Sequence, residues 1–95
     1  MRLNPEIATY LKQLILEKIP GSTIFLFGSR VDDNALGGDI DLMILTNEPA
    51  DKRIFRKIRL EFIKKYGWRK IDFVNFTYSN DSSFRKLIEI SKIQL

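Results

Sequence analysis

Residues 23–45 read TIFLFGSRVDDNALGGDIDLMIL. The first run, Thr23 to Phe27, is apolar and rich in β-forming residues, which is typical of a strand buried on both faces. The second run, Asp39 to Leu45, also has the pattern of a strand. Gly28-Ser29 ends the first run. The polar segment from Arg30 to Gly38 separates the runs, and we expect it to hold a short helical turn and then a loop. The sequence therefore predicts two strands with a polar connection between them.

The second run alternates, so that it has one apolar face and one acidic face. Side chains along a strand point to opposite sides in turn. One face therefore carries Ile40, Leu42 and Ile44, and the other carries Asp39, Asp41 and Met43. The Cα atoms of Asp39 and Asp41 would lie about 6.5 Å apart on one face. Both carboxylates could then reach one hard cation, which oxygen ligands bind best.

Helical patterns flank this stretch on both sides. Asn4-Pro5-Glu6 has the residues of a helix start, and the apolar repeat that follows stops at Pro20-Gly21. After a loop, Asp51 can cap a second helix that Gly67 closes. A last helix is expected after the capping residues Ser79 to Ser83. Its apolar positions would be Phe84, Leu87, Ile88 and Ile93.

A third strand is predicted from Arg69 to Phe76, which completes an α-β-α-β-α-β-α order. This order indicates a small α/β fold in which a mixed sheet packs with helices. The second strand, the helix after Asp51 and the third strand form a β-α-β unit, so the two strands should be parallel. Asp72 would then start beside Asp39 and Asp41. If the first strand is antiparallel to the second, Gly28-Ser29 arrives at the same edge.

Three carboxylates beside a turn of small residues would suit the binding of a metal-complexed triphosphate. Three carboxylates can hold two divalent ions roughly 3.5–4 Å apart, one activating a hydroxyl and one holding a triphosphate. Gly28 lets the backbone approach phosphate oxygens, and Ser29 adds a hydroxyl donor. Arg30 could neutralise charge on the phosphates or on leaving pyrophosphate. We therefore take Asp39, Asp41 and Asp72 as candidate metal ligands, with Gly28, Ser29 and Arg30 as the candidate nucleotide-binding turn.

Composition limits the remaining possibilities. The 95 residues suit one domain spanning 1–95. The chain has no cysteine and no histidine, which excludes thiolate zinc sites, thiol nucleophiles and an imidazole base. A net charge of +4 favours acidic partners without identifying one. No signal-like or membrane-spanning run is recognisable, so a cytoplasmic protein without membrane partners is expected.

Together, Gly28-Ser29-Arg30, Gly38-Asp39-Ile40-Asp41-Leu42 and Ile71-Asp72-Phe73 resemble the minimal nucleotidyltransferases, or MNT proteins, of the DNA polymerase β superfamily. The resemblance covers nearly the whole chain. It implies a palm-like sheet, two Mg²⁺ ions, and transfer of a nucleotidyl group from ATP or another nucleoside triphosphate to a hydroxyl. Asp39, Asp41 and Asp72 would be the metal ligands, and Asp72 would also assist deprotonation of the acceptor.

The same resemblance implies a partner. MNT proteins are often encoded beside HEPN-domain ribonuclease toxins, and adding AMP to a toxin tyrosine silences it, so the MNT protein acts as antitoxin. Two alternatives stay open: an antitoxin that neutralises its partner by docking alone, and a transferase acting on a small molecule or an RNA end.

The basic residues from Lys52 to Lys70 form a cluster with two interpretations. A solvated helix face is favoured, and a patch that contacts a partner or RNA is the alternative. Nucleic acid is therefore not favoured as a partner. Trp68 is expected to pack at the helix end rather than to stack on a base.

Overall fold

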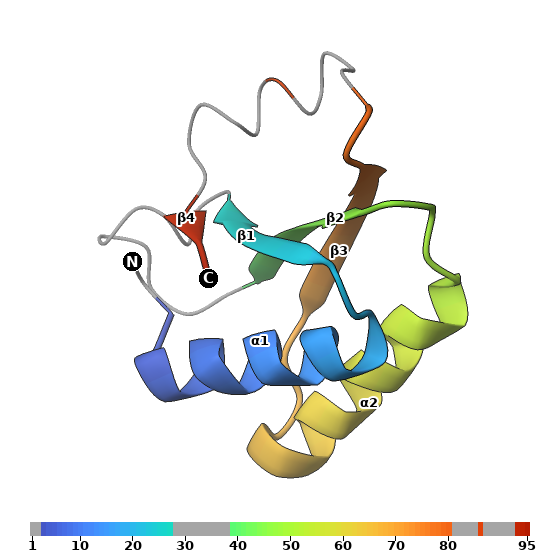
Figure 1. The fold of residues 1–95 in the computed structure, drawn as a ribbon. Coiled ribbons are helices and arrows are strands. Elements are labelled where there is room, and N and C mark those ends of the chain that lie inside the picture. The colour runs from blue at the N-terminus through green and yellow to red at the C-terminus, as the bar shows by residue number, and fades with distance from the viewer. Residues whose placement is uncertain (1–2, 28–38, 81–85, 87–92) are drawn as a thin grey trace.

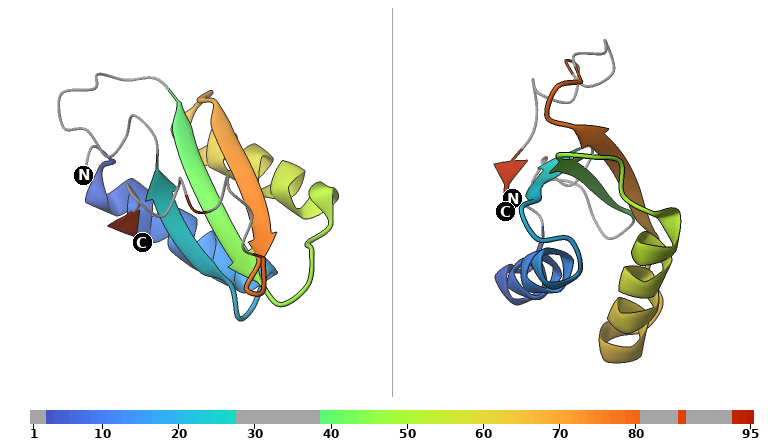
Figure 2. Two further views of the ribbon diagram at one scale, coloured as in Figure 1. Left: turned by 90° about the horizontal axis from the view of Figure 1, so that it is seen from above. Right: turned by 45° about the vertical axis from the view of Figure 1, so that its right-hand side comes forward.

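A computed structural model describes residues 3–27, 39–80, 86 and 93–95. These residues form one sheet whose strands are β1 (Thr23–Phe27), β2 (Ile40–Thr46), β3 (Ile71–Thr77) and β4 (Ile93–Gln94). Helices α1 (Pro5–Lys18) and α2 (Lys52–Tyr66) pack side by side on one face of it (Figures 1 and 2). The predicted mixed α/β architecture is confirmed.

The sheet order is β3-β2-β1-β4, so β2 lies between β3 and β1. Strand β1 runs antiparallel to β2, and β3 runs parallel to β2. Both directions match the sequence prediction, because the crossover through α2 requires a parallel return. The predicted strands begin within two residues of the observed ones.

The end of the chain departs from the prediction. Ile93, expected in a last helix, lies instead in β4, where it pairs antiparallel with Leu26. The Leu95 N–H also donates to the Ile24 oxygen at 2.9 Å. Strand β1 would otherwise leave backbone groups unpaired on this side, and helical spacing cannot reveal that demand. Lys86 is helical, whereas the other residues of the expected last helix and the turn expected within 30–38 lie outside the described residues.

The helix ends follow the predicted capping chemistry. The Asn4 side chain accepts a hydrogen bond from the Glu6 N–H at 2.8 Å, and Pro5 opens α1. The Asp51 side chain accepts from the Arg53 N–H at 2.9 Å and begins α2. Gly67 ends α2 with φ of 89°, a conformation that favours glycine. These caps fix where the β2–α2–β3 crossover begins and ends.

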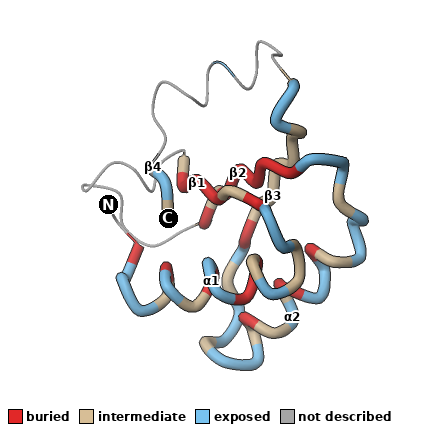
Figure 3. The backbone as a smooth tube through the Cα atoms, viewed as in Figure 1, coloured by how far each residue is buried: buried red, intermediate tan, exposed pale blue. Residues whose placement is uncertain are grey.

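One apolar core lies between the helices and the sheet (Figure 3). Alternate residues of β2 enter it, as expected, and they meet the apolar stripes of both helices. Its fully buried side chains include Leu11, Ile15, Leu26, Ile40, Leu42, Ile44, Ile58 and Phe62. The opposite face of the sheet carries a smaller buried cluster of Phe25, Met43 and Leu45. Central strand β2 is therefore buried on both faces.

Neither helix within the described ranges is long and apolar enough to cross a membrane.

Two residues of α2 test how strongly the fold depends on this core. Ile58 is fully buried, whereas Leu60 is 52% exposed. Replacing Ile58 with Ala should lower the free energy of unfolding by about 2–5 kcal/mol, because it removes packed methyl groups and leaves a cavity. Leu60→Ala removes a side chain of the same size and should change it by no more than about 0.5 kcal/mol. Urea unfolding followed by circular dichroism measures both, and equal losses would contradict the assigned faces of α2.

Candidate active site

Strand pairing brings the three predicted acids to one end of the sheet. Asp41 stands opposite Asp72 in the parallel β2–β3 register. It stands opposite Phe27, the last residue of β1, in the antiparallel β1–β2 register. Asp39 directly precedes β2. The convergence inferred from the topology is therefore present in the fold.

The pKa of Asp41 reflects both its burial and its neighbouring carboxylates. Partial burial raises the pKa of Asp41 above its ordinary value, and the negative charges of Asp72 and Asp39 raise it further. A side-chain hydrogen bond with Asp72 acts in the same direction, while the positive charge of Lys70 opposes it. Like charges this close disfavour ionisation, as they do in carboxylate pairs that bind protons or cations. The cluster therefore favours a positive charge beside it.

Lys70 supplies a positive charge to the acid cluster. Its Nζ lies 3.6 Å from Oδ2 of Asp39 and 3.9 Å from Oδ2 of Asp72. The sequence pattern groups Lys70 with the basic cluster of the preceding helix and does not indicate this contact with the acids. The available signal was its spacing: in an extended chain, residues 70 and 72 share a face. The acidic end of the sheet thus already binds one cationic group.

The donor set fits a hard divalent cation in its chemistry, since all three residues offer carboxylate oxygens. Over the described part of the chain, no three His, Cys, Asp or Glu side chains converge closely enough to hold a metal ion as they stand. Binding an ion would therefore require Asp39, Asp41 and Asp72 to close up, with Lys70 giving way. These side chains are only partly buried, which leaves them room to do so.

Gly28, Ser29 and Arg30, the candidate nucleotide-binding turn, lie outside the described residues. Phe27 immediately precedes them and is paired with Asp41. The chain therefore leaves β1 beside the acid cluster, which is where the topology predicted that the turn would begin.

Two neighbouring residues have other roles. Asp51 was predicted to cap the second helix, and this is confirmed: its side chain accepts a hydrogen bond from the Arg53 N–H, and hydrogen bonds from Arg53 lower the pKa of Asp51 to about 2. The expectation that Trp68 packs at the end of α2 is wrong, because its side chain is 79% exposed. Trp68 directly follows Gly67, the residue that ends α2.

The pKa of Asp41 gives a direct test of this arrangement. Carbon-13 NMR titration of the side-chain carboxyl should place it above 3.8. Asp72→Asn should lower that pKa by removing a negative charge, and Lys70→Met should raise it by removing a positive one. If the side chains of Asp41, Asp72 and Lys70 were far apart, neither substitution would change the pKa of Asp41.

The same shift has a consequence for stability. Between pH 3.8 and the pKa of folded Asp41, the folded state binds more protons than the unfolded state. Stability is therefore lost as the pH rises through this window. Asp41→Asn should stabilise the protein at pH 7 by about 0.5 kcal/mol, the size of a like-charge pair across two strands. Thermal unfolding at pH 3 and pH 7 checks this, and destabilisation at pH 7 would contradict it.

Comparison with known proteins supports the assignment of the fold. The model of the nucleotidyltransferase domain matches residues 5–95. No curated protein matches the sequence significantly. A Shewanella oneidensis structure of a tri-AMPylated HEPN toxin in complex with an MNT antitoxin is similar with a TM-score of 0.66 and 20% identity. The match covers 90% of this chain and 66% of the matched chain in that structure. This chain therefore spans just under two thirds of the length of the matched chain.

Two further structures are similar. A toxin–antitoxin complex of MntA with a Y104A mutant of HpeT gives a TM-score of 0.74 at 21% identity, over 98% of this chain and 72% of that one. A structure from Sulfolobus solfataricus, provisionally assigned as a nucleotidyltransferase, gives 0.56 at 15% identity, over 94% and 76%. At these identities the likeness shows a shared fold. Because the family model matches nearly the whole of this chain, the chain belongs to the nucleotidyltransferase domain family.

Proposed function

We propose that this chain is a metal-dependent nucleotidyltransferase that moves AMP from ATP to a tyrosine hydroxyl of a HEPN-family protein and so acts as its antitoxin in the cytoplasm. The observation that carries the proposal is the grouping of Asp39, Asp41 and Asp72 where β2 and β3 begin and β1 ends. The fold shared with an MNT antitoxin that is bound to an AMPylated HEPN toxin supports the choice of acceptor.

Each acid has a role in the proposed site. Asp39 and Asp41 would hold the metal ions, and Asp72 would be the third ligand. Two Mg²⁺ ions, when bound, would supply charge for the triphosphate and lower the pKa of the attacking hydroxyl. Asp72 stands opposite Asp41 and could accept the hydroxyl proton. Gly28, Ser29 and Arg30 would contact the phosphates of ATP.

The proposed reaction is an in-line displacement at phosphorus. The acceptor oxygen forms a bond to the α-phosphorus, and the bond from that phosphorus to the oxygen bridging the α- and β-phosphates breaks. Pyrophosphate leaves with the electron pair of the broken bond, and the hydroxyl proton passes to Asp72. Lys70 would give way to the metal ions at Asp39 and Asp72, and its ammonium group would then be available to balance negative charge on the phosphates.

Labelled ATP tests this function. The chain should be incubated with α-³²P-labelled ATP, Mg²⁺ and a HEPN protein encoded beside it. The HEPN protein should become labelled, and its toxicity should fall. Asp39→Asn/Asp41→Asn and chelation by EDTA should each reduce labelling to background, because either one removes the cation site. Asp51→Asn is the matched control, since Asp51 is exposed, lies outside the cluster and caps a helix as Asn also can.

The outcomes separate the alternatives. Full labelling by the Asp39/Asp41 variant, or no labelling of any HEPN partner, would contradict the proposal. If the Asp39→Asn/Asp41→Asn variant fails to label the HEPN protein but still protects cells from its toxicity, the antitoxin effect is due to docking alone. A labelled RNA end or small molecule in place of the protein would assign a different acceptor.

A further inference from the structure

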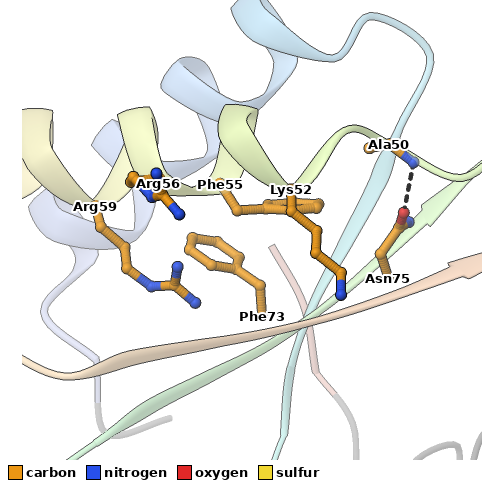
Figure 4. Close-up of a pocket in the computed structure, with 7 residues that line it drawn as sticks. All are labelled: Ala50, Lys52, Phe55, Arg56, Arg59, Phe73 and Asn75. Atoms are coloured by element: carbon orange, nitrogen blue, oxygen red, sulfur yellow. Dashed lines mark hydrogen bonds between the residues drawn. The ribbon is translucent and has the colours of Figure 1, made fainter.

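We propose that the outer edge of β3 and the pocket beside it bind an extended acidic segment of a partner protein. We call this cavity the basic pocket and define it by Lys52, Phe55, Arg56, Arg59, Phe73 and Asn75. It lies between α2 and β3 and has a volume of about 420 Å³ (Figure 4). Phe73 and Asn75 alternate with Asp72 along β3, so the basic pocket opens on the opposite face of the sheet from the acids.

The positive charge of its lining residues makes the basic pocket suitable for binding an anion. Lys52, Arg56 and Arg59 contribute three positive charges, and none of the described residues that line the pocket is acidic. Within the described ranges, none of these three side chains forms an ion pair with a carboxylate. Arg59 is half-buried, which strengthens its attraction for a negative group that displaces water. A planar carboxylate suits the guanidinium groups, which can donate two hydrogen bonds to it.

A nucleic acid base fits the basic pocket poorly. The Phe73 ring stacks on Phe55 at 4.9 Å and also lies 4.9 Å from the guanidinium carbon of Arg59. Its surface is therefore already in contact with other side chains. The Asn75 amide is likewise engaged, because its Oδ1 accepts from the Ala50 N–H at 2.8 Å and its Nδ2 donates to the Ile44 oxygen at 3.0 Å. The pocket offers charge without a free platform for stacking or an amide for reading base edges.

The neighbouring strand edge favours a peptide. β3 is the last strand on its side of the described sheet. The Ile40 N–H donates to the Lys70 oxygen, and the Tyr78 N–H donates to the Thr46 oxygen, so even-numbered residues of β3 face β2. Phe73 and Asn75 consequently direct their backbone groups outward. Such an edge can add a strand from another chain, whose backbone supplies affinity while pockets select its side chains.

The basic side chains near the β3 edge also determine which kind of strand can pair with that edge. Arg59 Nε donates to the Ile71 oxygen at 2.9 Å, which closes the beginning of the edge and leaves the part next to the basic pocket. Positive charge along an edge repels a second basic strand, and this chain carries a net charge of +4. An added strand with Asp or Glu at alternate positions would instead place its carboxylates in the basic pocket. Its intervening side chains would lie on the face that carries Asp41 and Asp72.

The site therefore explains how a partner could be held close to the acid cluster. Peptide binding does not depend on nucleotidyl transfer, and either property can be tested without the other. Combined with the proposed function, the β3 edge would hold an acceptor protein with hydroxyl side chains beside Asp72.

Three probes and two matched variants test the inference. The probes are an acetylated, amidated octapeptide of alternating glutamate and valine, the same peptide with glutamine for glutamate, and an octauridylate RNA. The pocket variant is Lys52→Gln/Arg56→Gln. The control variant is Lys57→Gln/Lys64→Gln, which removes two charges from exposed positions of α2 outside the basic pocket. Dissociation constants are measured by fluorescence anisotropy, and the contact site by amide chemical shifts.

The glutamate peptide should bind at least about 10-fold more tightly than the glutamine peptide, and the pocket variant should lose about 10-fold in affinity. The control variant should lose about twofold through general charge. The largest amide shifts should fall on Phe73 and Asn75, and both variants should unfold near the wild-type temperature. Equal losses in the two variants, shifts elsewhere on the molecule, or pocket-dependent binding of the RNA in preference to the peptide would overturn the inference.

Discussion

The whole arrangement depends on the pairing of β2 with two different neighbours. Its antiparallel partner β1 ends opposite Asp41, and its parallel partner β3 begins with Asp72 opposite the same residue. One central strand thus brings together segments more than thirty residues apart. The register is fixed by the difference between the two faces of β2, because a slip of one residue would exchange them and move Asp41 to the face of the main core. The position of the acids is therefore a consequence of core packing.

The acid cluster works against the stability that the core provides. Asp41 and Asp72 are placed directly opposite each other, and their repulsion contributes to the raised pKa of Asp41. Burial of side chains such as Leu42, Ile44 and Phe62 offsets this cost. Lys70 reduces it further through Asp39 and Asp72. Local conflict within an otherwise consistent fold is typical of functional sites, since the repulsion that weakens folding also creates affinity for a cation.

Much of this was accessible from the sequence because several signals agreed. Apolar alternation gave the faces of β2, capping residues gave the ends of α1 and α2, and the crossover gave the direction of β3. Long-range pairing was harder to predict. Ile93 was placed in a helix because its pairing with Leu26 leaves no local pattern. Lys70 was placed on a basic surface because its attraction to Asp39 appears only when β2 and β3 are side by side. The basic pocket likewise requires α2 and β3 to be in contact, so spacing along the chain does not reveal it.

The most direct test of a shared cation site is titration with Mn²⁺, followed by the paramagnetic broadening of backbone amide signals. Clustered carboxylates predict that Asp39, Asp41 and Asp72 broaden first and together, and that Asp41→Asn/Asp72→Asn abolishes the effect. Broadening that survives this double substitution, or that begins at separate acids such as Glu48 or Glu61, would contradict a common binding site.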